Sequence, residues 1–418
     1  MQIERHMNSG QSFVPPGDLV SLHKYIVNTI PTLNLNVKVM FGRFVSHRDK
    51  LRMTIAAAGG CLISGMSLRD TSLHSADAEK LDQMKYPRPP TVGKQPKING
   101  LKIFSGNANT TLAENVAKLV GVELGKITVD RFVDGEVDVM VHENVRGKDV
   151  YIVQPTCVPV NEHLMELLLM VSTMRRSSAR RITAIIPYYG YARQDRKMAA
   201  RVPISAADVA RLLEAMGVDR VIAVDLHCGQ IQGFFGPRVP VDNLDGGLVG
   251  VSYFANHELV NPVIVSPDAG GVARAKKFRE WLVGKYGVQN VGLAMIIKQR
   301  VRANEIDKMD LVGNVEGSDC IIVDDMIDTA GTLCKAAQHL NDHGARNVYA
   351  FASHGLFNGT ASEKIQKSNL KEVVVVNTTP LPESCKDNEK ITQLDIAPLI
   401  AQAIQNIHDK KSVSMLFD

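Results

Sequence analysis

The chain has 418 residues, of which 45% are hydrophobic, an ordinary composition for a soluble globular protein with more than one core. Its net charge of +4 gives no strong case for binding to nucleic acid or to a membrane surface, but it leaves room for a local basic site that binds phosphates. None of the six cysteines forms a CxxC pair or a zinc-type cluster with histidine, which favours a reduced intracellular protein.

Residues 1–96 lack sustained periodicity and end in a stretch rich in proline and lysine, which has linker composition. No apolar run reaches the roughly 18 residues that a membrane-spanning helix needs. The uncharged run 54–68 follows a cluster of basic side chains, and this order is typical of a targeting segment. We therefore expect either a poorly ordered extension on a cytoplasmic protein or a segment that addresses an organelle.

From Leu101 onward, short strands rich in valine and isoleucine alternate with helical patterns. The expected strands are 101–104, 150–154, 182–187, 220–226, 263–266, 320–323, 348–353 and 373–377. The expected helices are 111–120, 162–174, 205–216 and 332–340. Strands that are apolar on both faces are typical of parallel sheets covered by helices on both sides.

This alternation predicts an α/β fold with two tandem doubly wound domains and mainly parallel sheets. We place the boundary near Gly246–Gly247, between an N-terminal domain of residues 97–246 and a C-terminal domain of residues 247–418. The final residues are candidates for packing back on the first domain. Ligands of such sheets lie beyond the carboxyl ends of the strands, so the polar residues there are the candidate site residues.

A short polar turn after residue 131 carries an aromatic ring and two acids. Phe132 could stack on a base such as adenine, while Asp134 and Glu136 could accept from its amino group. The alternative is a plain turn, because Asp-Gly is first of all a turn signal.

Two further strand ends in the N-terminal half carry polar side chains. Arg193 and Gln194 follow an apolar strand, where a guanidinium could clamp a triphosphate; a solvated charged loop is the alternative. His227 ends the strand that begins at Val221. A lone histidine is usually structural, and Asp225 could hold its tautomer.

In the C-terminal half, Asp268 follows the strand 263–266, and Gly270–Gly271 behind it would let a ligand approach the backbone. Lys298, Arg300 and a third cation at Arg302 lie within five residues. By itself such a stretch is usually a solvated basic loop.

The strongest motif is the stretch 321–332. Asp324 and Asp325 end a buried strand and could hold ribose hydroxyls, directly or through Mg²⁺. The turn that follows would present backbone N–H groups and two hydroxyls at a helix N-terminus, which is an anion cradle. Its residues are Asp328, Thr329, Ala330, Gly331 and Thr332. The alternative is an acidic start that only complements the helix dipole, but three acids, two threonines and a glycine favour a sugar-phosphate site.

Taken together, these segments resemble the ribose-phosphate pyrophosphokinases of the type I phosphoribosyltransferase fold. The matching motifs are 103–106, 131–136, 191–197, 225–227 with 230–235, 265–271, 298–304 and the Asp324 motif. The resemblance runs from about Lys97 to the last residue and leaves residues 1–96 outside it.

The resemblance implies transfer of a diphosphate from ATP to ribose 5-phosphate with Mg²⁺ as cofactor. Phe132, Asp134 and Glu136 are then adenine contacts, and Arg193 and Gln194 triphosphate contacts. His227 is implied to be a ligand of the ATP-bound magnesium, and Asp268 to hold a second metal and the ribose hydroxyls. Lys298 and Arg300 would lie in a mobile loop that closes over ATP and stabilises the transferring charge.

The resemblance also implies a homo-oligomer, a hexamer by family, with phosphate and ADP as effectors and with no nucleic-acid or membrane partner. The candidate effector residues are Asn144, Arg146 and Gln232. Gly229 stands where many relatives carry a small hydroxyl residue, so the strength of phosphate activation stays open.

Two other functions remain as alternatives. A phosphoribosyltransferase that consumes the product would share the Asp324 motif but needs neither an adenine pocket nor tandem domains. A non-catalytic regulatory homologue would be expected to have lost part of the basic loop or of the cradle, and this chain retains both.

Overall fold

The computed structural model describes residues 100–302 and 305–417, and the side chains of residues 298–308 lie outside this description. The extension predicted for residues 1–96 also falls outside the described residues. Among those that are described, no helix is long and apolar enough to cross a membrane.

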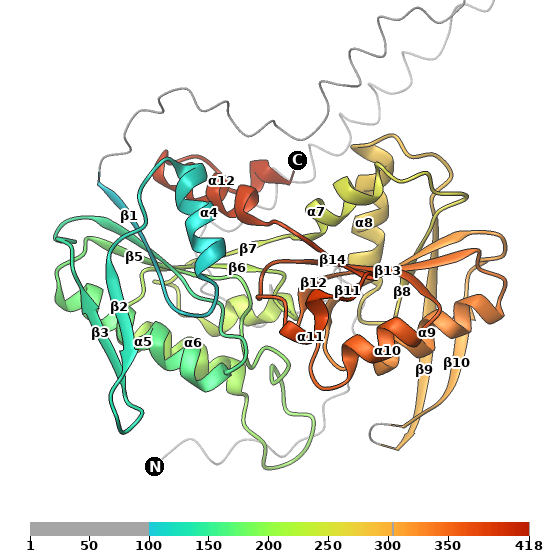
Figure 1. Ribbon diagram of the computed structural model, residues 1–418, viewed down its shortest axis with the longest axis horizontal. Coiled ribbons are helices and arrows are strands. Elements are labelled where there is room, and N and C mark those ends of the chain that lie inside the picture. Colours follow the sequence, from blue (N-terminus) through green and yellow to red (C-terminus); the bar gives the residue numbers. More distant parts are fainter. Residues whose placement is uncertain (1–99, 303–304, 418) are drawn as a thin grey trace, which may run out of the picture. The chain divides into compact units, whose positions relative to one another are not determined.

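The first sheet is parallel and has the strand order β1-β4-β5-β6-β7 (Figure 1). Its strands are β1 (Leu101–Ser105), β4 (Asp149–Val153), β5 (Arg181–Ile186), β6 (Arg220–Val224) and β7 (Val241–Leu244). The connecting helices are α4 (Thr110–Val120), α5 (Val160–Arg176) and α6 (Ser205–Met216), with the short 3₁₀ turn η1 (Gly229–Phe234) before β7. All strands except β7, and all three helices, are as predicted to within a few residues.

The second sheet has the order β10-β9-β8-β11-β12-β13-β14, and only the pair β9–β10 is antiparallel. Its strands are β8 (Val263–Ser266), β9 (Gly292–Arg302), β10 (Glu305–Val312), β11 (Asp319–Ile327), β12 (Asn347–Gly355), β13 (Leu370–Val376) and β14 (Ile391–Leu394). Its helices are α7 (Gly247–Phe254), α8 (Val272–Gly284), α9 (Gly331–Asp342), α10 (Ala361–Lys367), α11 (Glu383–Lys386), α12 (Ala397–His408) and the 3₁₀ turn η2 (Ser414–Leu416). The mainly parallel α/β fold is thus confirmed.

A separate antiparallel hairpin of β2 (Ile127–Arg131) and β3 (Val137–Val141) belongs to neither sheet. Its turn is closed by two backbone hydrogen bonds, from Phe132 N–H to Glu136 O (2.8 Å) and from Gly135 N–H to Phe132 O (2.9 Å). Gly135 has φ = 93°, which few residues with a side chain adopt. The turn predicted after residue 131 is therefore confirmed as the tip of a hairpin.

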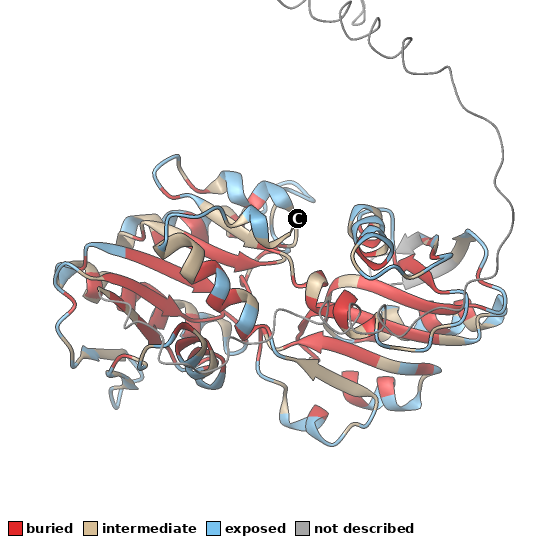
Figure 2. Cartoon of the chain, turned by 90° about the horizontal axis from the view of Figure 1, so that it is seen from above, coloured by how far each residue is buried: buried red, intermediate tan, exposed pale blue. Residues whose placement is uncertain are grey.

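Helices cover both faces of each sheet, so the strands are buried while the helices keep exposed outer faces (Figure 2). One apolar cluster packs α5 and α6 on the first sheet, and another packs α9 and α10 on the second. A third cluster contains Ile185 of β5, Val323 of β11 and Ile404 of α12 among others, so both sheets share one core. Helix α12 packs against α4, which joins the end of the chain to its first half.

Besides elements that were not predicted, three predicted segments differ in detail. Strand β11 continues to Ile327, because β12 pairs with it along its whole length, so Asp324 and Asp325 lie within the strand. Strand β6 ends at Val224, because Asp225 has φ = 39° and leaves the extended conformation. The basic segment expected to be a loop is β-strand as far as Arg302, because β10 supplies an antiparallel partner.

Candidate active site

The candidate site lies where loops from the two sheets meet. Strands β8, β11 and β12 are parallel neighbours, so the loops that follow them emerge at one edge of the second sheet. The loop after β6 of the first sheet joins them there through direct hydrogen bonds, described below.

The junction between the sheets is a set of hydrogen bonds around Asp225. Its carboxylate accepts from the Ser353 hydroxyl and from Gly246 N–H (2.9 Å). Its backbone carbonyl accepts from Nε2–H of His354 (3.1 Å), whose Nδ1 lies 2.9 Å from the Thr378 hydroxyl. Burial lowers the pKa of His354 to about 4, so this ring stays neutral at physiological pH. The junction thereby holds the loop that carries His227 against strand β12.

His227 from the first half contacts Asp325 from the second. Its Nδ1–H donates to Asp325 Oδ2 at 2.7 Å. The same carboxyl group lies 3.7 Å from the guanidinium of Arg274, on the first turn of α8. The alternative in which Asp225 holds the His227 tautomer is wrong, because Asp225 points into the junction and Asp325 takes that role.

The neighbouring acids of β11 have different surroundings. The side chain of Asp324 is 34% exposed and that of Asp325 only 6% exposed. Burial alone would raise the pKa of Asp325, but the hydrogen bond from His227 and the charge of Arg274 bring it well below its usual range. Burial and the charge of Asp325 raise the pKa of Asp324. Arg274 lies near both acids, at 3.5 Å from Asp324 and 3.7 Å from Asp325. Asp325 is buried and also pairs with His227, while the side chain of Asp324 is partly open to a ligand.

Beyond β11, the loop 328–332 enters α9. Its carbonyl oxygens are used internally: Asp328 O accepts from Asn358 N–H (3.1 Å), and Thr329 O from Lys364 Nζ (3.2 Å). Ala330 adopts φ = 56°, an uncommon left-handed conformation that turns the chain into the helix. The first N–H groups of α9 have no acceptor within the helix, so the loop can present them to an anion.

Arg193 reaches this cradle from the loop after β5. Its Nη1 donates to Asp328 Oδ2 at 2.6 Å, and Asn358 Nδ2 donates to Asp328 Oδ1 at 2.7 Å. The guanidinium remains half-exposed. Gln194, beside it, accepts from the Ser205 hydroxyl at 2.5 Å and so is held by the start of α6. The predicted triphosphate contact and the predicted sugar-phosphate cradle therefore meet in space.

Asp268 lies in the exposed loop between β8 and α8. Its Oδ1 accepts from Gly271 N–H at 3.0 Å, while its backbone carbonyl accepts from the Ser266 hydroxyl at 2.6 Å. Within the described part of the chain, no three metal-binding side chains are grouped closely enough to hold a metal ion by themselves. With Nδ1 of His227 fixed by a carboxylate, its Nε2 is oriented as in a metal-binding histidine.

The remaining candidates lie in separate places. Phe132 at the hairpin tip is 54% exposed, and Asp134 Oδ1 accepts from Glu136 N–H (3.1 Å) within the same turn. Asn144 Oδ1 accepts from Arg146 N–H (3.0 Å). Gln232 lies on η1, where its side chain donates to Gly229 O (3.2 Å). The backbone of Lys298 and Arg300 lies on β9, and their side chains are outside the described residues.

Sequence reasoning missed Arg274 and Asn358, which contact the acids of the site. Neither belongs to a recognisable motif: Arg274 is one of several cations on α8, and Asn358 lies in the loop after β12. Arg274 does follow Gly270–Gly271, on the first turn of a helix. This position was the one feature of the sequence that could have marked it as a site residue.

Comparison with known proteins identifies relatives over most of the chain. The family described as the N-terminal domain of ribose phosphate pyrophosphokinase matches residues 101–217. The family described as the phosphoribosyl synthetase-associated domain matches residues 290–418.

Two curated relatives carry the name ribose-phosphate pyrophosphokinase. That of Helicobacter pylori is 50% identical over 327 residues, covering 78% of this chain and 98% of the relative. That of Wolinella succinogenes is 50% identical over 320 residues, covering 77% of this chain and all of the relative. The crystal structure of phosphoribosylpyrophosphate synthetase from Mycobacterium smegmatis superposes with a TM-score of 0.67 at 40% identity, covering 75% of this chain and 100% of that one.

Proposed function

Because this chain belongs to the ribose-phosphate pyrophosphokinase family, we propose that it transfers the β,γ-diphosphate of ATP to the anomeric hydroxyl of ribose 5-phosphate. The products are 5-phosphoribosyl 1-diphosphate and AMP, which feed nucleotide biosynthesis. The observation that supports this reaction best is the meeting of the two halves of the chain, at the contacts His227–Asp325 and Arg193–Asp328. A reaction between a nucleotide and a sugar phosphate needs two anion sites that face each other.

The sugar phosphate would occupy the second half. The N–H groups and hydroxyls of residues 328–332 would bind its 5-phosphate, and Asp324, the more exposed acid, would accept from its hydroxyl groups. Asp325 would orient His227 by accepting its Nδ1–H hydrogen bond. Asp268, on the neighbouring loop, would contact the ribose hydroxyls and a metal ion.

The nucleotide would use the first half. Phe132, Asp134 and Glu136 would contact adenine, while Arg193 and Gln194 would bind the triphosphate. Arg193 pairs with Asp328 in this structure. To bind a phosphate group, the Arg193 guanidinium would have to contact both the phosphate and Asp328, or release Asp328.

The anomeric oxygen would attack the β-phosphorus in line, forming one P–O bond as the bond to the α-phosphate oxygen breaks and AMP leaves. His227 would hold the ATP-bound Mg²⁺ and Asp268 a second metal ion, and these ions would supply positive charge that neutralises the phosphates. Lys298 and Arg300 would stabilise the charge on the transferring diphosphate and on AMP. The residues therefore act by positioning and by charge rather than through a covalent intermediate.

Four broader features are also proposed. The strand–helix alternation supports two phosphoribosyltransferase-like domains at residues 97–246 and 247–418. Family membership implies a homo-oligomer of hexameric type, with phosphate and ADP as effectors acting at Asn144, Arg146 and Gln232. The location would be cytoplasmic unless residues 1–96 address an organelle.

The proposal is tested with purified full-length protein, ATP, ribose 5-phosphate and Mg²⁺, with nucleotides separated by chromatography. AMP should appear only when ribose 5-phosphate is present, and one AMP should form per sugar consumed. Release of ADP would indicate single-phosphate transfer, and absence of any ATP turnover under these conditions would refute the assignment.

A further inference from the structure

The β2–β3 hairpin is a two-stranded ribbon outside both main sheets, and such ribbons are marginally stable in water by themselves. One face packs against the core cluster that contains α5, through Ile127, Val129, Val139 and Val141. These side chains are only partly buried, and the tip lies beyond them. The tip, which is proposed to bind adenine, therefore needs further contacts to fix its direction.

Arg131, the residue directly before Phe132, supplies such contacts. Its Nε donates to Glu162 at 3.0 Å and its Nη2 donates to Glu166 at 2.7 Å. These glutamates are four residues apart on α5, so one planar guanidinium bridges two carboxylates on the same face of a helix. Its Nη1 also donates to the carbonyl of Asp130 at 3.1 Å, which fixes the guanidinium to its own strand.

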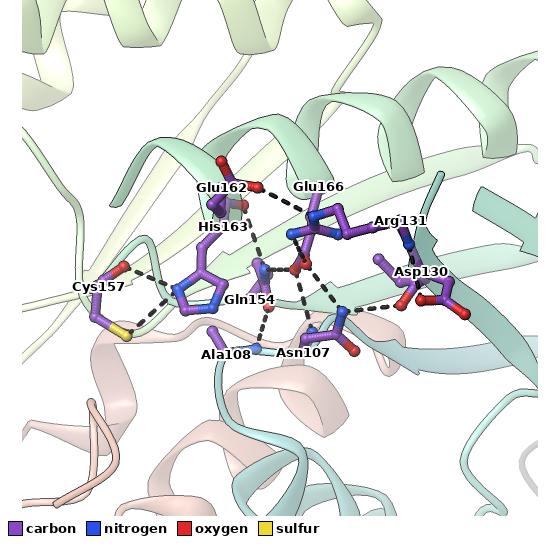
Figure 3. Close-up of polar contacts among 10 residues, drawn as sticks. Asn107, Ala108, Asp130, Arg131, Gln154, Cys157, Glu162, His163 and Glu166 are labelled. Atoms are coloured by element: carbon purple, nitrogen blue, oxygen red, sulfur yellow. Dashed lines mark hydrogen bonds and ion pairs between the residues drawn. The ribbon is translucent and has the colours of Figure 1, made fainter. Parts of the chain in front are cut away.

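Glu166 is the buried centre of this network (Figure 3). Its side chain is 1% exposed. Besides Arg131, it accepts from Gln154 Nε2 (2.6 Å), Asn107 Nδ2 (2.9 Å) and Asn107 N–H (3.3 Å). An ionised carboxylate withdrawn from water is stable only with such partners, and here every partner is a donor.

The same network connects the hairpin to the first sheet. Asn107 follows β1, and its Nδ2 also donates to the carbonyl of Val129 in β2 at 2.9 Å. Gln154 follows β4, is fully buried, and accepts from Ala108 N–H at 3.1 Å. A Cβ on Gly106 would lie 2.3 Å from Gln154 Oε1, so only glycine leaves room for this arrangement. The hairpin is thus tied to two strands and one helix by polar contacts.

We propose that Glu166, acting through Arg131, is a positioning residue for nucleotide binding that fixes the direction of the hairpin tip. This inference rests on the proposed function, in which Phe132 contacts adenine. Neither Glu166 nor Arg131 needs to touch the nucleotide. Loss of their contact should weaken ATP binding while the chemical step, once ATP is bound, proceeds as before.

The test is steady-state kinetics of Arg131→Ala in the full chain. Its KM for ATP should rise about tenfold, while kcat at saturating ATP and the KM for ribose 5-phosphate change by less than about twofold. Arg131→Lys should restore only part of the affinity, because an ammonium cannot reproduce the planar set of donors that joins the buried Glu166 to the Asp130 carbonyl. Glu162→Gln is the matched control: Glu162 is the exposed partner, so this variant should stay within about twofold of the unaltered protein.

A double-mutant cycle with Phe132→Ala separates positioning from general damage. If Arg131 acts through the tip, adding Arg131→Ala to Phe132→Ala should raise the KM for ATP by less than about twofold further. A full additional tenfold increase would contradict the proposal. So would an unchanged KM for ATP in Arg131→Ala, or a parallel loss of kcat and of ribose 5-phosphate affinity.

Amide hydrogen exchange tests, independently of activity, whether the Arg131–Glu166 contact holds the hairpin in place. Residues 127–141 should exchange faster in Arg131→Ala and Glu166→Gln than in Glu162→Gln. Unchanged exchange would refute the positioning role of Arg131 and Glu166, even if the unaltered protein makes AMP. If the unaltered protein makes no AMP, the proposed function is refuted. The exchange result would then still decide whether Arg131 and Glu166 hold the hairpin in place.

Discussion

Adjacent residues of the same type have different tasks in this site. Asp324 and Asp325 follow each other on β11, and the Arg274 guanidinium lies near both, at 3.5 Å from Asp324 and 3.7 Å from Asp325. They differ because Asp325 is buried and accepts from His227, whereas Asp324 keeps a third of its side chain exposed. We therefore propose that Asp324 contacts a ligand while Asp325 orients His227.

This difference can be measured with single substitutions. Asp324→Asn should weaken binding of ribose 5-phosphate about tenfold with little effect on unfolding, because an exposed acceptor is lost. Asp325→Asn should lower the free energy of unfolding by roughly 1–3 kcal/mol, because His227 loses its buried charged partner, whereas Arg274 keeps Asp324. Calorimetric titration with ribose 5-phosphate and chemical denaturation give the two quantities. The reverse pattern, or an equal loss of ATP binding in Asp324→Asn, would contradict these assignments.

Individual site residues could be predicted from the sequence only where they are contiguous in the chain. The motif 324–332 is contiguous, so its acids, threonines and glycine could be recognised together. Arg274 is 50 or 51 positions away from its two acidic partners, and only the parallel pairing of β8 with β11 brings their loops together. For His227, sequence proximity pointed to Asp225, whereas the fold supplies a partner on another sheet.

At the scale of elements, strands buried on both faces were predictable and half-buried ones were not. Strands β4 and β13 each contain a continuous buried run with little polar character, residues 150–153 and 373–376. Strands β2 and β3 mix exposed and partly buried residues, so their sequence resembles a polar loop. Helix α12 did carry a readable signal, because Ala397, Ile400, Ala401 and Ile404 have helical spacing and are buried.

The first sheet contains a carboxylate whose ionisation should contribute to stability. Asp149 begins β4, is 4% exposed, and accepts from the guanidinium groups of Arg180 and Arg181 at 2.6–3.1 Å. Burial alone would raise its pKa, but these hydrogen bonds lower it from 3.8 to about 2. Because the folded pKa lies below the unfolded one, the stabilisation is present above pH ~4 and is lost as the pH falls towards ~2.

Asp149→Asn should therefore cost roughly 2 kcal/mol of unfolding free energy at pH 7. The difference from the unaltered protein should shrink steadily between pH ~4 and ~2. Urea denaturation over this pH range provides the measurement. Asp208→Asn is a suitable control, since its pair with Arg211 is exposed and 3.7 Å long. A stability difference that is independent of pH would show that the charge of Asp149 is not the cause.

At the scale of the whole molecule, the two sheets behave as one folded body. They share an apolar core, α12 of the last segment packs on α4 of the first, and Asp225 joins β6 to β12. The site is assembled from both sheets, so its geometry depends on this shared packing. Separate expression of residues 97–246 would therefore remove half of the site.

Removal of residues 1–96 should leave a folded and active enzyme. A family relative aligns over its full length with 77% of this chain, and the matching region begins near residue 101. The expected kcat and unfolding midpoint of residues 97–418 are those of the full chain, measured side by side. An insoluble product, or loss of most activity at saturating substrate, would contradict this expectation. Altered location in cells with unchanged activity would instead identify a targeting role.

The proposed reaction attaches a diphosphate to C1 of the sugar. This bond can be observed by ¹³C NMR of ribose 5-phosphate labelled at C1, incubated with the full-length protein, ATP and Mg²⁺. The C1 signal should shift and become coupled to phosphorus, while AMP forms in equal amount. A C1 signal that keeps its position while ATP is consumed, or phosphorylation at another carbon, would contradict this reaction.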